Sequence, residues 1–474
     1  MSTDSVMTPV NGDQATIQRT PNYEEPVYQQ ALDHVWIHSG NYLELAEQQG
    51  LHVFERGENC TLYDARGEAW IDALAGLWVV NAGHGRQEIG DAMAKQAGQL
   101  AYVSSANYTS RPAVELAAKL AEITPGDLQR VFFCSGGSEA VETAIKIAKQ
   151  VQVLRGFPKR SKFIARRGSY HGMTYGAMSL TTGNRTQMER FFGPMMPGVY
   201  HVPSPNHYRN DFGLEGEAGD IMCAQWIEQE ILFQGPETVA AVIGEPISSA
   251  NGVHVPSPKY WQLVREICDR HGVLLILDEV ICGFGRTGKW FATEHFGIVP
   301  DIMTIAKGLS SGYAPIAAAI VRPHVYEAFM QGENVFSHLL TFGGQAVSAA
   351  AALKNIEIIE RENLVERGAE AGRYLLNGLQ MLVDTHPTVG DVRGLGLLCA
   401  IELVQDKATK VKWARNSDFI KRLHYLVNER RMLTRVWEIL HLAPPLVVTH
   451  TEIDQIVGIL DECLTQVEGE FGLR

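Results

Sequence analysis

Two charged residues follow apolar segments in the middle of the chain. Residues 274–277 form an uninterrupted apolar run, typical of a buried parallel strand, that ends on Asp278 and Glu279. A second apolar segment, residues 302–306, is followed by Lys307. If the two segments are neighbouring strands, Asp278 and Lys307 emerge at the same edge of a sheet, where open α/β sheets place their ligands. One aromatic cofactor fits between them.

A lysine amine and a carboxylate are the two groups that pyridoxal phosphate requires of a protein. An amine whose pKa is lowered forms a Schiff base with it, and a carboxylate on the pyridine nitrogen keeps the ring electron-withdrawing. The pattern assigns these roles to Lys307 and Asp278 as a hypothesis. Taken alone, the pair also fits an Asp278 that caps a helix and a Lys307 that is a solvated surface residue.

The segment between these residues suggests a different ligand. Residues 283–288, GFGRTG, have the G-x-G-x-x-G spacing of dinucleotide sites, and with Lys289 they resemble a P-loop beside the acidic strand of an ATPase. No clear amphipathic helix opens at the last glycine, however, and Trp290 stands where a magnesium-binding Ser or Thr is needed. A nucleotide-dependent ATPase is therefore the weaker interpretation.

A glycine-rich turn is predicted to begin a helix upstream of these segments. Ser135, Gly136, Gly137 and Ser138 follow a short strand, and helical spacing of apolar residues begins at Ala140. The free N–H groups and the dipole of a helix N-terminus bind anions, so the phosphate of a cofactor is the natural occupant. The alternative is that Ser138 only caps the helix.

Two further predicted strands also end on residues that suit such a site. Tyr170 and His171 follow the strand predicted over residues 162–165, and an aromatic ring placed there can stack on a planar cofactor. His171 taken alone fits a structural histidine equally well. Glu245 follows the strand predicted over residues 239–243. These positions are consistent with one site built along one edge of a sheet.

The composition limits the partners and the compartment. Of the 474 residues, 20% are charged and 45% hydrophobic, and the net charge of −13 disfavours nucleic acid or an anionic membrane as a partner. The chain has no apolar signal-peptide core, no run of eighteen apolar residues, and no C-x-x-C among its seven cysteines. We therefore expect a cytoplasmic protein without disulfides. The histidines lack metal-ligand spacing, so no metal site is expected.

The order of the predicted elements indicates more than one domain. Buried strands alternate with amphipathic helices in the middle of the chain, which is typical of an α/β fold with a mostly parallel sheet. After about residue 345, hairpin-like strands and helices predict a separate α+β lobe. We expect a flexible tail over 1–25, the first part of a small domain over 26–75, a large cofactor-binding domain over 76–344, and the rest of the small domain over 345–474.

Six motifs occur together along the chain in an order known from one family. They are SGGSEAVETAIKIAK, SYHGMTYGAMSLT, EPI, LLILDEVICGFGRTGKWFA, AKGLSSGYAPIAA and TFGGQAVSAAAAL. Together they resemble the class III aminotransferases, which are fold type I pyridoxal phosphate enzymes, over roughly residues 40–465. The resemblance implies a large α/β domain with a mostly parallel seven-stranded sheet sandwiched by helices, and a small α+β domain made from both chain ends.

The resemblance also implies roles for single residues. Lys307 matches the Schiff-base lysine, and Asp278 matches the partner of the pyridine nitrogen. The other implied cofactor-binding residues are Gly136, Gly137 and Ser138 at the phosphate, Tyr170 stacked on the ring with His171 beside it, Glu245, Val280 behind the other face, and Thr341. Thr341 matches a residue that reaches the phosphate from a neighbouring subunit, so the functional unit is expected to be a homodimer with shared active sites, with a tetramer left open.

On the substrate side, DEVICGFGRTGKWF is similar to the ω-transaminase branch that transfers amino groups to pyruvate. The ornithine and 4-aminobutyrate branch typically has Gln where Ile281 stands. Arg435 matches a mobile arginine that binds an acceptor's carboxylate, although this chain continues VWEIL where many relatives have Gly-Asp. The positions that match the substrate pocket are Leu77, Trp78, Tyr108, Ala250 and Ile281, and their bulk favours small or flat side groups.

The reaction implied is a ping-pong transamination. An amine or ω-amino acid gives up its amino group, and an oxo acid, pyruvate, then takes it and leaves as alanine. Lys307 serves as the general base, while Asp278 keeps the ring an electron sink. A class III aminomutase or decarboxylase is the alternative within the family. The donor is left open among β-alanine, taurine, a diamine and an aromatic amine.

Overall fold

The computed structural model describes residues 26–40, 51–183 and 185–474. The chain divides into two compact units, one with the described residues up to Arg56 together with Leu62–Ala69, and one with Gly57–Thr61 and Trp70–Arg474. This division differs from the domain boundaries expected from the sequence, which stay a prediction. The tail expected over residues 1–25 lies outside the described residues.

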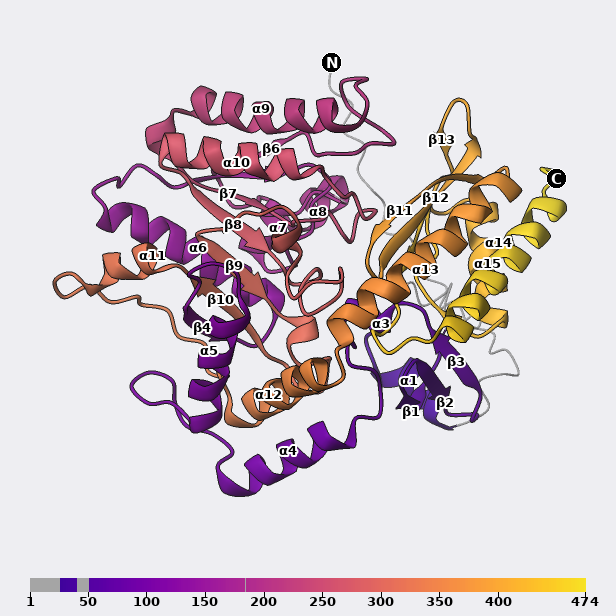
Figure 1. The fold of residues 1–474 in the computed structure, drawn as a ribbon, viewed down its shortest axis with the longest axis horizontal. Helices are drawn as coiled ribbons and strands as arrows, with labels where there is room; N and C mark the ends of the chain where they lie inside the picture. The colour runs from indigo at the N-terminus through magenta and orange to yellow at the C-terminus, as the bar shows by residue number, and fades with distance from the viewer. Residues whose placement is uncertain (1–25, 41–50, 184) are drawn as a thin grey trace, which may run out of the picture. The chain divides into compact units, whose positions relative to one another are not determined.

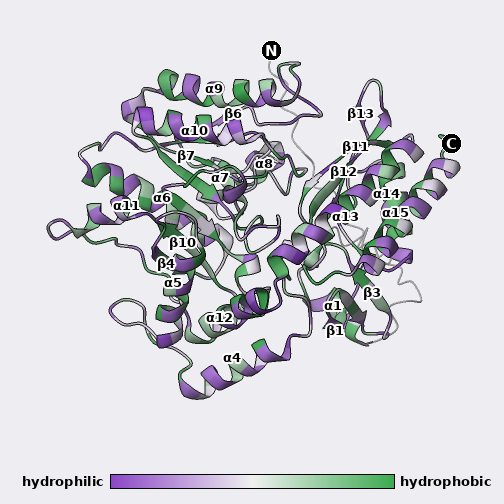
Figure 2. Cartoon of the chain, viewed as in Figure 1, coloured by the Kyte–Doolittle hydropathy of each residue, from purple (hydrophilic) through white to green (hydrophobic). Residues whose placement is uncertain are grey.

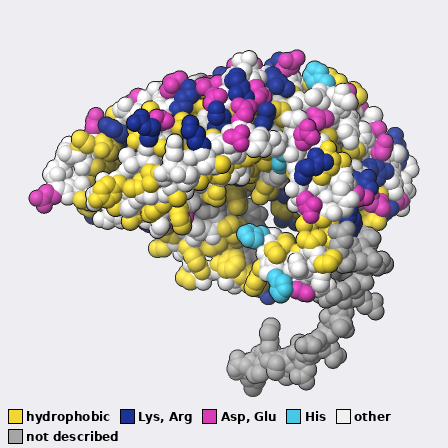
Figure 3. Space-filling model, turned by 90° about the horizontal axis from the view of Figure 1, so that it is seen from below, with side chains coloured by type: hydrophobic (Ala, Val, Ile, Leu, Met, Phe, Trp, Pro, Cys, Tyr) yellow, Lys and Arg dark blue, Asp and Glu magenta, His cyan; other side chains and the backbone are white. Residues whose placement is uncertain are grey.

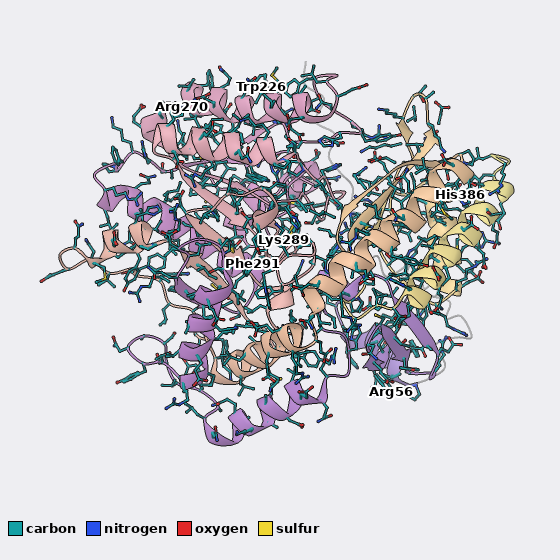
Figure 4. The ribbon with its side chains drawn as sticks, in the orientation of Figure 1. Arg56, Trp226, Arg270, Lys289, Phe291 and His386 are labelled. Atoms are coloured by element: carbon teal, nitrogen blue, oxygen red, sulfur yellow. The ribbon has the colours of Figure 1, made fainter. Side chains whose placement is uncertain are left out.

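The smaller unit is built around one buried aromatic ring. Its helix α1 spans Pro26–His34, and it also contains the first residues of β1 (Phe54–Glu58) and most of β2 (Thr61–Asp64). Tyr28 of α1 is fully buried, and the Arg66 guanidinium lies 4.9 Å from the centre of its ring. Arg56, labelled in Figure 4, lies in the same way 3.4 Å from the Tyr63 ring. Cation–π contacts therefore complement a small apolar core.

A seven-stranded sheet is the centre of the larger unit (Figure 1). Its strand order is β4-β10-β9-β8-β7-β5-β6. The strands are β4 (Arg130–Cys134), β5 (Lys162–Arg166), β6 (Val199–Val202), β7 (Val239–Gly244), β8 (Leu274–Asp278), β9 (Ile302–Ile305) and β10 (Ala317–Val321). Strands β5 to β9 pair in parallel, and β10 is antiparallel to both β9 and β4. The expected mostly parallel sheet is therefore confirmed.

The central strands are apolar throughout because helices cover both faces of the sheet. Helix α6 (Gly137–Leu154) lies on one face, and α9 (Gly216–Gln234) and α10 (Pro258–His271) lie together on the other. In β8, Leu274 and Ile276 pack in the core on the α6 side, whereas Leu275 and Leu277 pack on the α9 and α10 side. Such two-sided burial requires the continuous hydrophobic runs that Figure 2 shows in green along these strands.

Short helices and long amphipathic helices connect the remaining strands. In the first half of the larger unit they are α3 (Ala75–Trp78), α4 (Gln87–Gln99), α5 (Arg111–Ile123), α7 (Tyr175–Leu180), α8 (Arg185–Phe192) and the 3₁₀ turn η2 (Pro236–Thr238). Beyond β8 they are η3 (Ala292–His295), η4 (Lys307–Leu309), α11 (Pro323–Glu327), η5 (Ala328–Met330) and α12 (Ala346–Arg361). Within the described residues, no helix is both long and apolar enough to span a membrane.

The chain after α12 forms a second sheet with helices packed against it, the α+β pattern expected there. Its helices are α13 (Leu364–Thr385), α14 (Asp418–Glu429) and α15 (His450–Glu470). Its strands are β11 (Val389–Leu395), β12 (Leu398–Asp406), β13 (Val411–Lys412) and β15 (Ile439–Leu442), with β12 pairing to all three others. The short strand β14 (Met432–Leu433) pairs in parallel with Ile71 and Asp72, at the end of β3 (Ala69–Asp72).

A buried histidine joins the end of α13 to α15 (Figure 4). His386 Nδ1 lies 2.8 Å from Glu468 Oε2, and Nε2 lies 2.8 Å from Asp461 Oδ1. The other oxygen of Glu468 accepts a hydrogen bond from the Thr388 hydroxyl at 2.6 Å. Burial by itself lowers the pKa of His386, but the two carboxylates outweigh it and raise that pKa above its ordinary value. The protonated imidazole is thus a cross-link between the two helices.

We expect the His386→Leu variant to lose about 1–3 kcal/mol of unfolding free energy at pH 6, because it removes the imidazole partner of one oxygen of the buried Glu468 carboxylate. A raised histidine pKa adds stability that is complete below the unfolded-state pKa of about 6.5 and is lost as the pH rises through the folded-state value. The loss measured by urea unfolding should therefore shrink at pH 9. Arg422→Gln, which removes an exposed ion pair between α14 and Glu470 of α15, is the control and should change stability little at either pH. An equal loss for His386→Leu at both pH values would contradict the assignment.

Candidate active site

Residues at the ends of five strands meet at one edge of the seven-stranded sheet. Because β10 is antiparallel to both of its neighbours, β4 runs in the same direction as β5, β7, β8 and β9. The carboxyl ends of all five strands therefore lie at the same edge. The candidate residues at this edge are Gly136 and Gly137 after β4, Tyr170 and His171 after β5, Glu245 after β7, Asp278 at the end of β8, and Lys307 after β9.

Asp278 is a buried carboxylate held by a histidine. It is 4% exposed, and its Oδ2 lies 2.8 Å from His171 Nδ1. Its Oδ1 accepts the backbone N–H of Val280 at 3.1 Å. The other ring nitrogen of His171 is buried, with no hydrogen-bond partner in the described part of the chain. A carboxylate can accept about four hydrogen bonds, so Asp278 is oriented by His171 and retains room for a further donor.

Lys307 follows β9, the neighbour of β8, after the single residue Ala306. Its φ of 47° is unusual for a residue with a side chain, and it places the lysine at the first position of η4. Burial lowers the pKa of its amine to about 8, and the charges of Asp278 and Glu245 counteract part of this effect. An amine with this pKa is neutral in an appreciable fraction near pH 7 and can act as a nucleophile or a base.

Glu245 binds backbone N–H groups of two loops, and its charge raises the pKa of Lys307. It is 3% exposed, and its two oxygens accept the backbone N–H groups of Tyr170 at 3.2 Å and Ser249 at 3.0 Å. Burial raises the pKa of its carboxyl above the ordinary value. Glu245 therefore fixes the two loops that follow β5 and β7, and with them the position of the Tyr170 ring.

The N-terminus of α6 points to the same edge. The N-cap of the helix is Gly136 and not Ser138, so the alternative that Ser138 serves as the cap is wrong. The Ser138 hydroxyl instead accepts the backbone N–H of Met173 at 3.1 Å, which ties the helix to the loop after β5. A Cβ on Gly137 would lie 2.9 Å from a methyl group of Val280. The free N–H groups of the first helical turn thus lie close to the residues that follow β8.

A second group of predicted residues gathers around Trp78. This residue is 2% exposed, and its centre lies 5.5 Å from Lys307 Nζ and 4.6 Å from the Arg435 guanidinium carbon. The guanidinium donates a hydrogen bond to the Ala250 carbonyl. Ile281 and Ala250 pack in the same apolar cluster as Trp78. Burial lowers the pKa of Arg435 to about 10, and the charge of Arg415 adds to the shift. An arginine therefore lies beside the lysine in largely apolar surroundings.

Three predicted residues are not brought to this group. Leu77 is 52% exposed and Tyr108 is 68% exposed. Tyr108 borders a different cavity of about 900 Å³, which is also lined by Phe133 and Tyr326. Thr341 is exposed in a turn before α12. Across residues 26–40, 51–183 and 185–474, no contact joins any of the three to Lys307 or Asp278, so their assignments stay predictions.

The sequence did not indicate two buried residues that shape the Trp78 region. His441 of β15 is fully buried, lies edge-on to Trp78 with ring centres 5.4 Å apart, and has Nε2 3.0 Å from Arg435 Nη2. Asp72 accepts the backbone N–H groups of Leu74 at 3.1 Å and Gly76 at 2.7 Å, which holds the turn leading to Trp78. The one available signal was a polar residue in an otherwise apolar strand, inside β15 for His441 and at the end of β3 for Asp72.

The GFGRTG segment, residues 283–288, connects several loops of the larger unit through hydrogen bonds. Arg286 within it is fully buried and donates to the carbonyls of Leu397 and Pro444 and to the Asn81 side chain. Lys289, near Phe291 in Figure 4, donates to the Glu294 carbonyl at 3.2 Å. The next regular element is only the four-residue η3, so the helix that a nucleotide phosphate needs is absent from this described segment. The local structure does not favour the nucleotide alternative.

A sheet of this topology, with a lysine and a carboxylate at adjacent parallel strand ends and a helix N-terminus beside them, is the arrangement that the sequence resemblance implied. The model of the family named aminotransferase class-III matches residues 42–464. The chain therefore belongs to the class III aminotransferases.

Known proteins of this family are similar along nearly the whole chain. Taurine–pyruvate aminotransferase of Bilophila wadsworthia is 40% identical over 432 residues, which cover 89% of this chain and 94% of that protein. Putrescine–pyruvate aminotransferase of Pseudomonas aeruginosa is 36% identical over 428 residues, covering 90% and 93%. The crystal structure of a thermostable (S)-enantioselective omega-transaminase from Thermomicrobium roseum has a TM-score of 0.89 and 40% identity, covering 93% of this chain and 98% of that one.

The effect of the Asp278 charge on the pKa of the Lys307 amine can be measured. Because Asp278 raises the pKa that burial lowers, the Asp278→Asn variant should have a lysine pKa further below about 8. The measurement is the pH dependence of reductive methylation of Lys307 in protein freed of small molecules, followed by peptide mass spectrometry. Glu470→Gln on α15 is the control and should leave the profile unchanged. A pKa that rises in Asp278→Asn would contradict the described charge balance.

Proposed function

We propose that this aminotransferase moves an amino group from an amine or ω-amino acid to pyruvate, with pyridoxal phosphate as its cofactor. The observation that carries the proposal is the low-pKa amine of Lys307 beside the buried carboxylate of Asp278. The names of the taurine–pyruvate and putrescine–pyruvate relatives support pyruvate as the acceptor. Those names do not favour an aminomutase or a decarboxylase. Because the two donors differ in chemistry, the donor of this chain is best found with a panel of amines.

The residues at the strand edge fit the cofactor. Lys307 Nζ has neither a hydrogen bond nor an ion pair within the described chain, and Asp278 can accept another donor. We propose that Asp278, oriented by His171, accepts the ring N–H of the cofactor. Gly136, Gly137 and Ser138 are proposed to hold its phosphate at the N-terminus of α6. The remaining proposed contacts are Tyr170 and Val280 on the two faces of the ring, Glu245 behind Tyr170, and Thr341 at the phosphate from a partner subunit.

When bound, pyridoxal phosphate supplies a ring that withdraws electrons from the substrate carbon beside the amino group. Lys307 is then the base that takes the proton from this carbon at Nζ and later returns a proton in the same region. Its pKa of about 8 suits both the uptake and the return of the proton, because near neutral pH the amine exists in both protonated and neutral forms. Asp278 stays at the far side of the site and does not exchange protons with the substrate.

The residues around Trp78 are proposed to select the substrate. Arg435 is a cation in apolar surroundings and would pair with the carboxylate of pyruvate. Trp78 and Ile281 are buried beside it and would limit the side group to a small or flat one. Ala250 and, at greater distance, the exposed Leu77 and Tyr108 complete the proposed pocket. We also propose a cytoplasmic location, which the seven unpaired cysteines support.

A homodimer is proposed as the functional unit, with a tetramer as a possible higher assembly. Large apolar side chains are exposed near Thr341, among them Leu339 at 59% and Phe342 at 63%. Figure 3 shows hydrophobic side chains gathered on parts of one face, with most charges along its upper edge. Extended exposed apolar surface is typical of protein interfaces.

We expect sedimentation equilibrium to give at least twice the chain mass of 52.4 kDa. Phe342→Asp, next to Thr341, should shift the protein towards the monomer and reduce its activity in parallel, because the shared sites come apart. Phe233→Asp is the control, because it replaces an 83% exposed aromatic ring on α9, away from Thr341 in the sequence. It should change neither the assembly nor the activity. A fully active monomer would exclude shared active sites.

The Lys307→Ala variant should lose transamination between an amine and pyruvate by about a thousandfold or more, because the base is removed. Lys289→Ala is the matched control, since it removes the lysine of the P-loop-like segment while leaving Lys307 in place. Alanine production, measured by chromatography with excess pyridoxal phosphate, should persist in this control. Full activity of Lys307→Ala, or loss of activity only in Lys289→Ala, would overturn the proposal.

A further inference from the structure

Cations and indole rings alternate beside the candidate site. The ring of Trp78 has Lys307 Nζ at 5.5 Å and the Arg435 guanidinium carbon at 4.6 Å from its centre. The ring of Trp437 has the same Arg435 carbon at 4.1 Å and the Arg415 guanidinium carbon at 3.8 Å. Arg435 therefore contacts two indole rings, one shared with the lysine and the other with a second arginine.

Arg435 has no carboxylate partner in the part of the chain that the structure describes. Glu438 lies three residues further along, yet both of its oxygens accept from Arg415, at 3.1 and 3.2 Å. The Arg435 guanidinium donates to the Ala250 carbonyl and lies 3.0 Å from a ring nitrogen of His441. Burial keeps the pKa of His441 well below its ordinary value, so this imidazole is neutral. Glu438 thus acts on Arg435 only through its charge at a distance, and the groups that contact the guanidinium directly are the indole rings and two neutral acceptors.

Resting on the proposed function, we propose that Trp437 is a positioning residue that determines specificity for carboxylate-bearing substrates. Its ring keeps the planar guanidinium of Arg435 turned towards Trp78 and Lys307, where the carboxylate of an oxo acid can pair with it. The ion pair between Arg415 and Glu438 in turn fixes the Trp437 ring. An indole leaves the guanidinium charge available to an incoming anion, whereas a carboxylate partner would neutralise it.

Trp437 lies in the segment where this chain departs from the family motif, VWEIL after the arginine. The neighbouring Val436 and Ile439 are buried, which anchors the backbone on both sides of the ring. Trp437 itself is only partly buried. Its ring can therefore be changed with less disturbance of the core than that of Trp78.

The test separates the two halves of the reaction, since only the acceptor half needs the carboxylate contact. Stopped-flow absorbance follows the bound cofactor, first with butylamine, which has no carboxylate, and then with pyruvate. In Trp437→Ala, the pyruvate concentration for half-maximal rate should rise about threefold to thirtyfold, which is the change in affinity expected when the energy of one cation–π contact is lost. The half-reaction with butylamine should change far less. Trp437→Phe keeps an aromatic face and should restore most of the pyruvate response.

Trp226→Ala is the matched control, because this tryptophan stacks on Phe212 at the surface of α9 (Figure 4) and should alter neither half-reaction. If Trp437→Ala does not fold, as judged by its melting temperature, Trp437→Gln takes its place. Equal losses in both half-reactions, or equal losses in Trp437→Ala and Trp437→Phe, would overturn the inference.

The Arg435→Ala variant separates the proposed role of Arg435 from that of Trp437. If it leaves the pyruvate response unchanged, the proposed carboxylate role of Arg435 fails, whereas a strong effect in Arg435→Ala with none in Trp437→Ala contradicts the role of Trp437 alone.

Discussion

The chemistry proposed for the candidate site depends on the balance between burial and charge at Lys307. Burial alone would drive the amine to its neutral form, and the carboxylates of Asp278 and Glu245 oppose this, leaving its pKa at about 8. Asp278 ends β8 and Glu245 follows β7, and both strands run parallel to β9. In the sheet β8 lies between β9 and β7. The direction of the strands therefore sets the electrostatics, because a reversed β7 or β8 would carry its acid to the opposite edge.

The geometry around Trp78 depends on segments that are far apart in the sequence. Asp72 holds the turn that leads to Trp78, and the ring is contacted by Arg435, which precedes β15, and by His441, which lies within β15. The parallel pairing of β14 with Asp72 and its neighbour Ile71 joins these segments. The part of the site that would choose the substrate thus combines residues in and before β15 with Trp78 of α3 and with residues that follow β7 and β8. The part that would hold the cofactor lies at the edge of the central sheet.

Much of the central sheet and of its strand-end residues could be predicted from the sequence, because two-sided burial leaves an uninterrupted apolar run. Asp278 and Glu245 stood out as the first charged residues after such runs, and Lys307 as the first charged residue after the segment 302–306. The neighbouring position of β8 and β9 is confirmed. The glycine-rich turn was correctly predicted to begin α6, and only the alternative with Ser138 as its N-cap is wrong, because Gly136 caps this helix without a side chain. His441 and Trp437 could not be found, since their significance comes from rings and charges that only the tertiary structure brings together.

The absorption spectrum of the purified chain with pyridoxal phosphate tests the central claim most directly. The account predicts a yellow protein that loses its colour when an amine is added and regains it with pyruvate, with one alanine formed for each site that recovers. The amine that bleaches the colour fastest would identify the donor class. A protein that stays colourless with the cofactor, or one whose colour an amine removes and pyruvate does not restore, would contradict the account.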